Sequence, residues 1–139
     1  REMLWGLSVA DVVKISDEEV EFLWGITPQE GAEKILRETG VRLVFVTCGK
    51  DGCWYQNRQA AGHADSLAGV QVKDTTGAGD IFGGSAVYQL LQTGKAPEDL
   101  TDAELARITR FACVSAGLST TRAGGISSVP ELADVLAAM

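Results

Sequence analysis

The stretch Asp74-Thr75-Thr76-Gly77-Ala78-Gly79-Asp80-Ile81-Phe82 carries the strongest structural signal of the chain. The residues before it, 70–73, are typical of a short strand, and the apolar run 81–91 after it is typical of a helix. A glycine-bearing turn that opens a helix leaves backbone N–H groups unpaired at the positive end of the helix dipole. Because glycine has no Cβ, a phosphate can approach this backbone closely. The stretch therefore predicts an anion site.

Asp80 distinguishes this turn from a simple phosphate cradle. A carboxylate repels an anion, so an anion site gains nothing from it in binding. Beside a transferring phosphoryl group, however, the same carboxylate is suited to take the proton from an attacking hydroxyl. The alternative is a tight strand-to-helix turn in which Asp80 only caps the helix.

Residues 74–82 match, at every fixed position, the signature Asp-Thr-(Thr/Asn)-Gly-Ala-Gly-Asp-x-Phe. In this signature the chain resembles the ribokinase-like (PfkB-type) carbohydrate kinases. The resemblance implies an α/β fold, a three-layer α/β/α sandwich with a mostly parallel sheet. It also implies ATP-dependent phosphorylation of a sugar hydroxyl, with Asp80 as general base. Gly77, Ala78 and Gly79 would then form the anion hole.

The length of the chain limits how much of such a kinase it can hold. Its 139 residues amount to about one domain, begin at Arg1 and are fewer than these kinases have. We therefore expect residues 1–139 to be the C-terminal, nucleotide-binding and catalytic-base part, without the N-terminal sugar-binding and lid part. On this interpretation the fragment alone does not phosphorylate a sugar.

Composition excludes several classes of partner. The chain is 45% hydrophobic, carries a net charge of −7 and has a pI near 4.6. It has no basic cluster, which argues against nucleic acid, and no apolar run near the roughly 20 residues of a membrane span. No signal-peptide pattern is present, and the odd number of cysteines lacks metal-ligand spacing. We therefore expect reduced thiols and a cytoplasmic protein.

Local patterns place the helices and strands around the signature. Capping boxes, Ser or Thr followed three residues later by Glu, start helices after Ser16, Thr27 and Thr101. Gly40 is expected to end the second of these helices. The remaining pattern predicts strands at 11–15 and 42–48, a hairpin of 53–56 with 59–64, and a last helix from Pro130.

Asp74 and Thr76 precede the anion turn. The resemblance implies that their oxygens help to hold a monovalent cation, usually K⁺, beside the phosphate loop. In the alternative reading Asp74 only accepts hydrogen bonds from turn N–H groups.

Two further motifs resemble nucleotide contacts of the family. Residues 47–52 resemble Thr-x-Gly-x-x-Gly, so Thr47, Gly49 and Gly52 would lie against the nucleotide; the alternative is an ordinary hairpin turn. Residues 14–19 resemble Lys-x-Asn-x-x-Glu, with Ser16 in place of Asn. Lys14 and Ser16 would contact the nucleotide and Glu19 would shape the water around Mg²⁺, although a capping box alone explains Ser16 and Glu19.

Cys113 stands in a helix that resembles the one packed near adenine in the family, where Asn is frequent. Cys113 keeps a small, weakly polar contact in place of an amide. His63, the single histidine, is interpreted as incidental.

The segment 12–23 resembles bacterial fructokinases, so fructose is the expected sugar. A 2-keto-3-deoxygluconate kinase, a ribokinase and a nucleotide-binding module without turnover remain open. A Rossmann dinucleotide domain fits less well, because its glycine turn follows the first strand. A homodimer is one arrangement open to the full-length enzyme.

Substitution of Asp80 tests the base. In the full-length protein we expect Asp80→Asn to lower turnover by a factor on the order of 10²–10⁴, because the proton acceptor is lost. ATP binding should persist, since the change removes a negative charge near the phosphates. Steady-state kinetics and an ATP titration measure the two effects. A near-normal kcat would reduce Asp80 to a helix cap.

Overall fold

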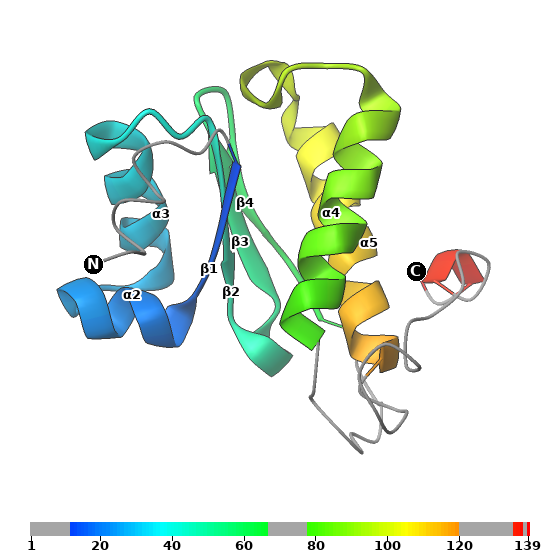
Figure 1. Ribbon diagram of the computed structural model, residues 1–139, viewed down its shortest axis with the longest axis horizontal. Coiled ribbons are helices and arrows are strands. Elements are labelled where there is room, and N and C mark those ends of the chain that lie inside the picture. Colours follow the sequence, from blue (N-terminus) through cyan, green and yellow to red (C-terminus); the bar gives the residue numbers. More distant parts are fainter. Residues whose placement is uncertain (1–11, 67–77, 120–134, 138) are drawn as a thin grey trace.

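The computed structural model of the protein describes residues 12–66, 78–119, 135–137 and 139. A four-stranded sheet lies between two pairs of helices, as Figure 1 shows. One face is covered by α2 (Asp17–Trp24) and α3 (Pro28–Glu38), and the other by α4 (Ala78–Thr93) and α5 (Asp102–Ser119). This layering confirms the predicted three-layer α/β/α class.

The strands follow one another in chain order across the sheet. They are β1 (Val12–Ser16), β2 (Leu43–Thr47), β3 (Cys53–Asn57) and β4 (Ala61–Ala64). β1 pairs with β2 in parallel, whereas β2 with β3 and β3 with β4 are antiparallel. The prediction of a mostly parallel sheet is therefore wrong for the described strands.

Connection length explains the two kinds of pairing. α2 and α3 bridge β1 to β2, which gives the long crossover that a parallel pair needs. β2 reaches β3 through the short 3₁₀ turn η1 (Gly49–Asp51), and residues 58–60 join β3 to β4. Such short links only allow antiparallel neighbours, and the second of them confirms the predicted hairpin. The strand expected at 70–73 lies outside the described residues.

β2 is buried on both faces and forms the centre of the core. Leu43 and Phe45 face α4 and α5, where Phe45 meets Phe82 edge to face at 5.7 Å between ring centroids. Val44 and Val46 face α2 and α3. All four side chains are at most 1% exposed, which explains why the strand is apolar at every position rather than alternating.

The three capping boxes are present as predicted. Each serine or threonine hydroxyl accepts from the backbone N–H of the glutamate three residues on, and the glutamate accepts in return; the pairs are Ser16 with Glu19, Thr27 with Glu30, and Thr101 with Glu104. In each helix two of the four orphan donors of the first turn are thereby satisfied locally.

The second of these helices ends within one residue of the predicted end at about Thr39, but the predicted cap, Gly40, is wrong. α3 ends at Glu38, before Gly40, and Gly40 is not among the described glycines with positive φ. The Thr39 backbone and hydroxyl both donate to the Ile35 carbonyl, at 3.0 and 2.6 Å, so a threonine satisfies the orphan acceptor. Of the predicted last helix, Pro130 lies outside the described residues and 135–137 are helical.

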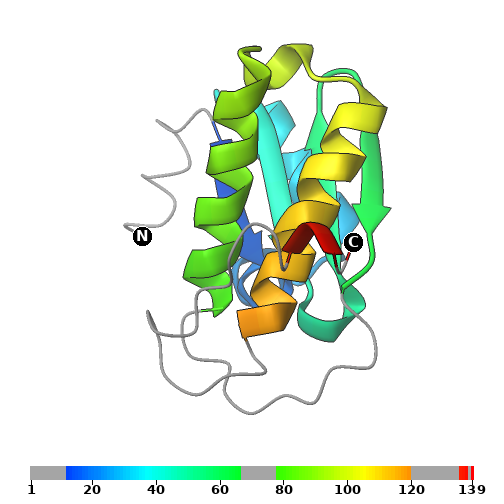
Figure 2. The ribbon, with the colours of Figure 1, turned by 90° about the vertical axis from the view of Figure 1, so that its right-hand side faces the viewer.

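α4 and α5 lie side by side over the sheet, as Figure 2 shows. The Ser85 hydroxyl donates to the Ser115 hydroxyl at 2.8 Å and joins the two helices. The Tyr55 hydroxyl donates to Asp102 Oδ1 at 2.8 Å and ties the start of α5 to β3. Burial and this bond together raise the Tyr55 pKa to about 12, so the bond persists across the neutral range.

A matched pair of glycine substitutions tests the packing of α3 on α2. A Cβ on Gly31 would stand 2.6 Å from Cγ1 of the fully buried Val20, whereas a Cβ on Gly84 of α4 meets nothing within 4 Å. Both Ala variants gain helix propensity, but only Gly31→Ala overpacks the core. We expect Gly31→Ala to be less stable than Gly84→Ala by about 1–3 kcal/mol in urea unfolding. Equal stabilities would show that α2 moves away freely.

Candidate functional site

Two of the predicted motifs meet at the carboxyl ends of β1 and β2, which we call the ligand edge of the sheet. Ser16 ends β1 and Thr47 ends β2, and the two residues are register partners of the parallel pair. α4 begins at the same end of the sheet, at the bottom of Figure 1. Carboxyl ends of parallel strands beside a helix N-terminus are where open α/β sheets bind ligands.

Lys14 reaches from β1 to the first turns of α4. It is the register partner of Phe45, so it lies on the sheet face that α4 and α5 cover. Its Cε and Cδ atoms lie 3.8 and 3.9 Å from the position that a Cβ would take on Gly83. These are ordinary van der Waals distances, so the methylene stem packs against α4 at Gly83, which is three residues beyond Asp80 in sequence. The chain thus brings a cation to the start of α4.

Ser16 and Glu19 occupy the next position along this edge. The Ser16 backbone N–H donates to Glu19 Oε1 at 2.9 Å, and the Glu19 N–H donates to Ser16 Oγ at 3.1 Å. The capping-box interpretation of both residues is therefore correct. The Ser16 hydroxyl still has its own hydrogen to donate, and the half-buried Glu19 carboxylate has a second oxygen. Their roles toward a nucleotide and Mg²⁺ stay predictions.

The loop after β2, residues 48–52, has the shape that its glycines allow. Gly49 has φ +56° and Gly52 has φ +89°, both in the region that favours glycine. Cys48 N–H donates to Gly52 O at 2.8 Å, Asp51 N–H to Cys48 O at 3.0 Å, and Gly52 N–H to Gly49 O at 3.2 Å. The loop is a hairpin turn and also lies at the ligand edge beside Thr47, so both interpretations of this motif fit the geometry.

The edge carries negative charge. Burial, followed by the nearby carboxylates of Asp17 and Asp51, raises the pKa of the buried Cys48 thiol to about 11. A phosphate ligand at this edge would therefore need compensating positive charge, from Lys14, the α4 backbone or a metal ion.

The anion turn itself is only partly described. Asp74, Thr76 and Gly77 lie outside the described residues. α4 starts at Ala78, which puts the backbone of Gly79 and Asp80 in its first turn, as the sequence predicts. The roles assigned to these residues stay predictions.

Cys113 lies in the core between the sheet and the α4–α5 layer, in one cluster with Cys53, the register partner of Thr47 at this edge. It is 6% exposed and shares its hydrophobic cluster with Cys53 and Leu105. Burial, partly opposed by the positive charge of Arg110, raises the pKa of its thiol to about 12. Such a side chain offers a ligand little surface, so its contact with a nucleotide stays a prediction.

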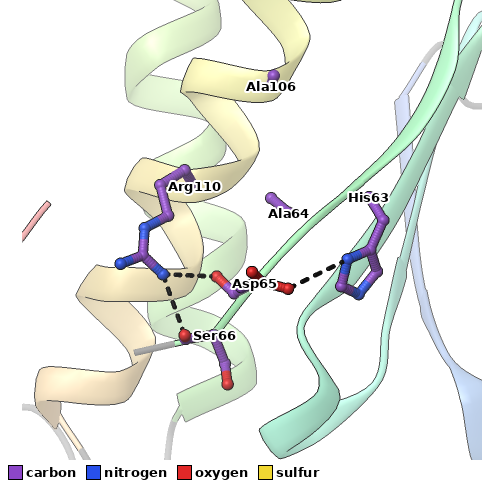
Figure 3. A pocket seen from close by; sticks show the side chains of 6 residues that line it. All are labelled: His63, Ala64, Asp65, Ser66, Ala106 and Arg110. Atoms are coloured by element: carbon purple, nitrogen blue, oxygen red, sulfur yellow. Dashed lines mark hydrogen bonds and ion pairs between the residues drawn. The ribbon is translucent and has the colours of Figure 1, made fainter. Parts of the chain in front are cut away.

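A pocket of about 500 Å³ lies beside the end of β4, and Figure 3 shows the six residues that line it. Arg110 Nη1 donates to the carbonyls of Asp65 and Ser66, at 2.7 and 3.0 Å. None of the predicted site residues lines this pocket; it is lined by His63, Ala64, Asp65, Ser66, Ala106 and Arg110.

His63 is the residue that sequence reasoning missed. Its ring contacts the Asp51 carbonyl of the loop after β2 and lies tilted against the Trp54 ring, so it is not incidental. The contact joins residues 12 positions apart and depends on the strand register, for which the sequence has no local signal.

A magnesium ion would have to bind here largely through the phosphates of a bound nucleotide. Among the described residues, no group of three or more His, Cys, Asp or Glu side chains could hold a metal ion. Mg²⁺ commonly binds through one or two carboxylates together with substrate phosphates, and Glu19 offers one such carboxylate. No helix within the described ranges is long and apolar enough to cross a membrane.

Comparison with known proteins identifies the family. Residues 2–132 match the pfkB family carbohydrate kinase. Fructokinase-1 of Zea mays is 40% identical over 130 residues, which cover 91% of this chain and 39% of the maize protein. The chain therefore spans about two fifths of the length of the curated relatives that it matches.

Solved structures agree in fold. The fructokinase of Xylella fastidiosa, with bound ATP, has a TM-score of 0.85 and 30% identity over 98% of this chain and 44% of its own. The fructokinase of Vibrio cholerae O395, in its fructose, ADP and calcium ion bound form, has a TM-score of 0.79 and 29% identity over 97% of this chain and 42% of its own. With residues 2–132 matched, this chain belongs to the pfkB family of carbohydrate kinases.

Proposed function

We propose that the protein phosphorylates a hydroxyl of a sugar, most specifically fructose, with ATP as the donor. The observation that carries the proposal is the pairing of Ser16 with Thr47, which sets two predicted nucleotide motifs side by side at the ligand edge of the sheet. Membership of the pfkB family supports the class of reaction.

In this proposal Asp80 takes the proton from the attacking sugar hydroxyl. The backbone N–H groups of Gly77, Ala78 and Gly79 stabilise the charge that develops on the transferred phosphoryl group. The start of α4 at Ala78 supports this role, because the first N–H groups of a helix have no partner within it.

The remaining roles concern the nucleotide and its cations. Lys14, Ser16 and Thr47 contact the phosphates, and the glycine loop allows close approach of the backbone. Mg²⁺, when bound, neutralises phosphate charge; Glu19 orders its water shell. Asp74 and Thr76 contribute oxygens to a K⁺ site. The full set of proposed nucleotide contacts is Lys14, Ser16, Thr47, Gly49, Gly52 and Cys113.

We assign the sugar site to a further, N-terminal part of the same kinase domain, and residues 1–139 to the nucleotide and catalytic-base part. The names of the maize and Vibrio relatives support fructose as the acceptor. The cysteines, all free and buried, suit a reducing compartment, so we place the enzyme in the cytoplasm, and a homodimer of it remains our proposal for assembly.

A substrate panel tests the proposed acceptor. We expect the full-length protein to release ADP with the highest kcat/KM on fructose, compared with ribose, tagatose and 2-keto-3-deoxygluconate, in a coupled assay. A higher value for another sugar would overturn fructose and leave the kinase class standing. ADP release with none of them would contradict the proposed function itself.

Lys14 offers a second test, aimed at the nucleotide edge. Lys14→Met keeps the methylene stem over Gly83 and removes the ammonium, so we expect the KM for ATP to rise about 10–100-fold, as loss of a charged hydrogen bond would cause. Lys34→Met is the matched control. Lys34 pairs with Glu38 at 2.8 Å on the surface of α3, where such a pair contributes little. Equal effects of the two variants would exclude Lys14 from the nucleotide site.

A further inference from the structure

The loop 48–52 is a short turn between β2 and β3 that contains two glycines. Its internal hydrogen bonds close a single 3₁₀ turn, and two of its residues, Gly49 and Gly52, add backbone freedom in the unfolded chain. Isolated turns of this kind are weak, so a loop that must present backbone atoms to a ligand needs support from outside.

His63 on β4 provides such support. Its Nε2 lies 2.5 Å from the carbonyl oxygen of Asp51, in the middle of the loop. A carbonyl oxygen only accepts, so Nε2 carries the hydrogen and donates it. The bond connects the loop to a strand that is not its sequence neighbour.

The imidazole ring is itself held in place. His63 is the register partner of Trp54 on β3, and the two rings lie 4.8 Å apart between centroids at an angle of 58°. His63 Nδ1 lies 3.5 Å from Asp65 Oδ1, which pairs with it only when both ring nitrogens are protonated, so the Trp54 contact and the Asp51 bond are what hold the neutral ring. The ring therefore has one orientation in which Nε2 faces the loop.

The loop also sits directly on the end of β4. A Cβ on Gly52 would overlap the Ala64 carbonyl oxygen and stand 2.9 Å from His63 Nε2. The absence of a side chain at Gly52 thus lets the loop approach His63 closely. Arg110 holds the carbonyls of Asp65 and Ser66 from α5, so the end of β4 is anchored on both sides (Figure 3).

We propose that His63 is a positioning residue for nucleotide binding, which fixes loop 48–52 through its bond to Asp51 and so sets the backbone that faces the phosphates. The inference rests on the proposed function, because it takes this loop as a nucleotide contact. His63 acts through the loop and does not touch the nucleotide or the sugar.

Kinetics of the full-length protein separate positioning from a general loss of structure. His63→Ala removes the donor, and we expect the KM for ATP to rise about tenfold while the KM for the sugar changes less than about twofold. His63→Gln supplies an amide donor and should recover part of the loss. Arg58→Ala is the control: Arg58 bonds Asp99 at 2.7 Å at the other end of the same hairpin, and both KM values should stay unchanged.

Amide hydrogen exchange measures how firmly the loop is held, independently of enzyme activity. Asp51 and Gly52 donate within the loop, so their amides should exchange faster in His63→Ala than in the wild type, with the buried β2 amides unchanged. Faster exchange throughout the protein would mean that His63 is merely structural, and would overturn the proposal.

The remaining outcomes are equally decisive. A raised KM for ATP without faster loop exchange would mean that His63 contacts the nucleotide itself, which overturns positioning. Faster loop exchange with a normal KM would mean that the shape of the loop does not govern binding, which also overturns it. If the wild-type protein neither binds ATP nor releases ADP, the proposed function itself is contradicted. This failure is seen in the wild type alone, so it is distinguishable from a failure of the His63 proposal.

Discussion

The parallel pairing of β1 with β2 is the constraint on which the candidate site depends. The strands pair residue for residue from Val12 with Leu43 to Ser16 with Thr47, so both end at the same level. A slip of one residue would move Val44 and Val46 to the opposite face, against α4 and α5. Because β2 is buried on both faces, the core fixes the register and thereby the position of the two motifs that follow the strands.

Charge is the second constraint on this edge. The chain has a net charge of −7, and Asp17, Glu19 and Asp51 all lie where β1 and β2 end. A nucleotide bound at this edge would therefore need local attraction, since the net charge of residues 1–139 repels it. The described structure supplies two local sources, the N-terminal turn of α4 and the Lys14 side chain that passes over Gly83.

Features with local causes could be predicted from the sequence. The capping boxes at Ser16, Thr27 and Thr101 start helices through bonds that span three residues, so their starts were predictable. The role of Gly40 as the cap of α3 was predicted wrongly, because the Thr39 hydroxyl donates to the Ile35 carbonyl at the end of this helix. The sheet was predicted as mostly parallel from the family resemblance, whereas the short turns after β2 and β3 dictate antiparallel neighbours.

The candidate site also combines features that the sequence predicts with features that it does not. Both motifs could be predicted to follow strands, and the register of the parallel pair places Ser16 and Thr47 side by side. The contact between His63 and Asp51 could not be predicted, because it depends on which residue of β4 faces Trp54 across the hairpin. The stem of Lys14 over Gly83 likewise joins residues far apart in the chain, and only the packing of α4 on the sheet brings them together.

Hydrogen–deuterium exchange of the full-length protein with and without Mg·ATP tests the central claim most directly. If the nucleotide binds where β1, β2 and α4 meet, protection should concentrate in peptides that cover 14–19, 47–52 and 78–83. The opposite end of the sheet, with the β3–β4 turn at 58–60 and the end of α4 at Gly94, should be unchanged. Protection confined to that opposite end, or no protection at saturating Mg·ATP, would contradict the account.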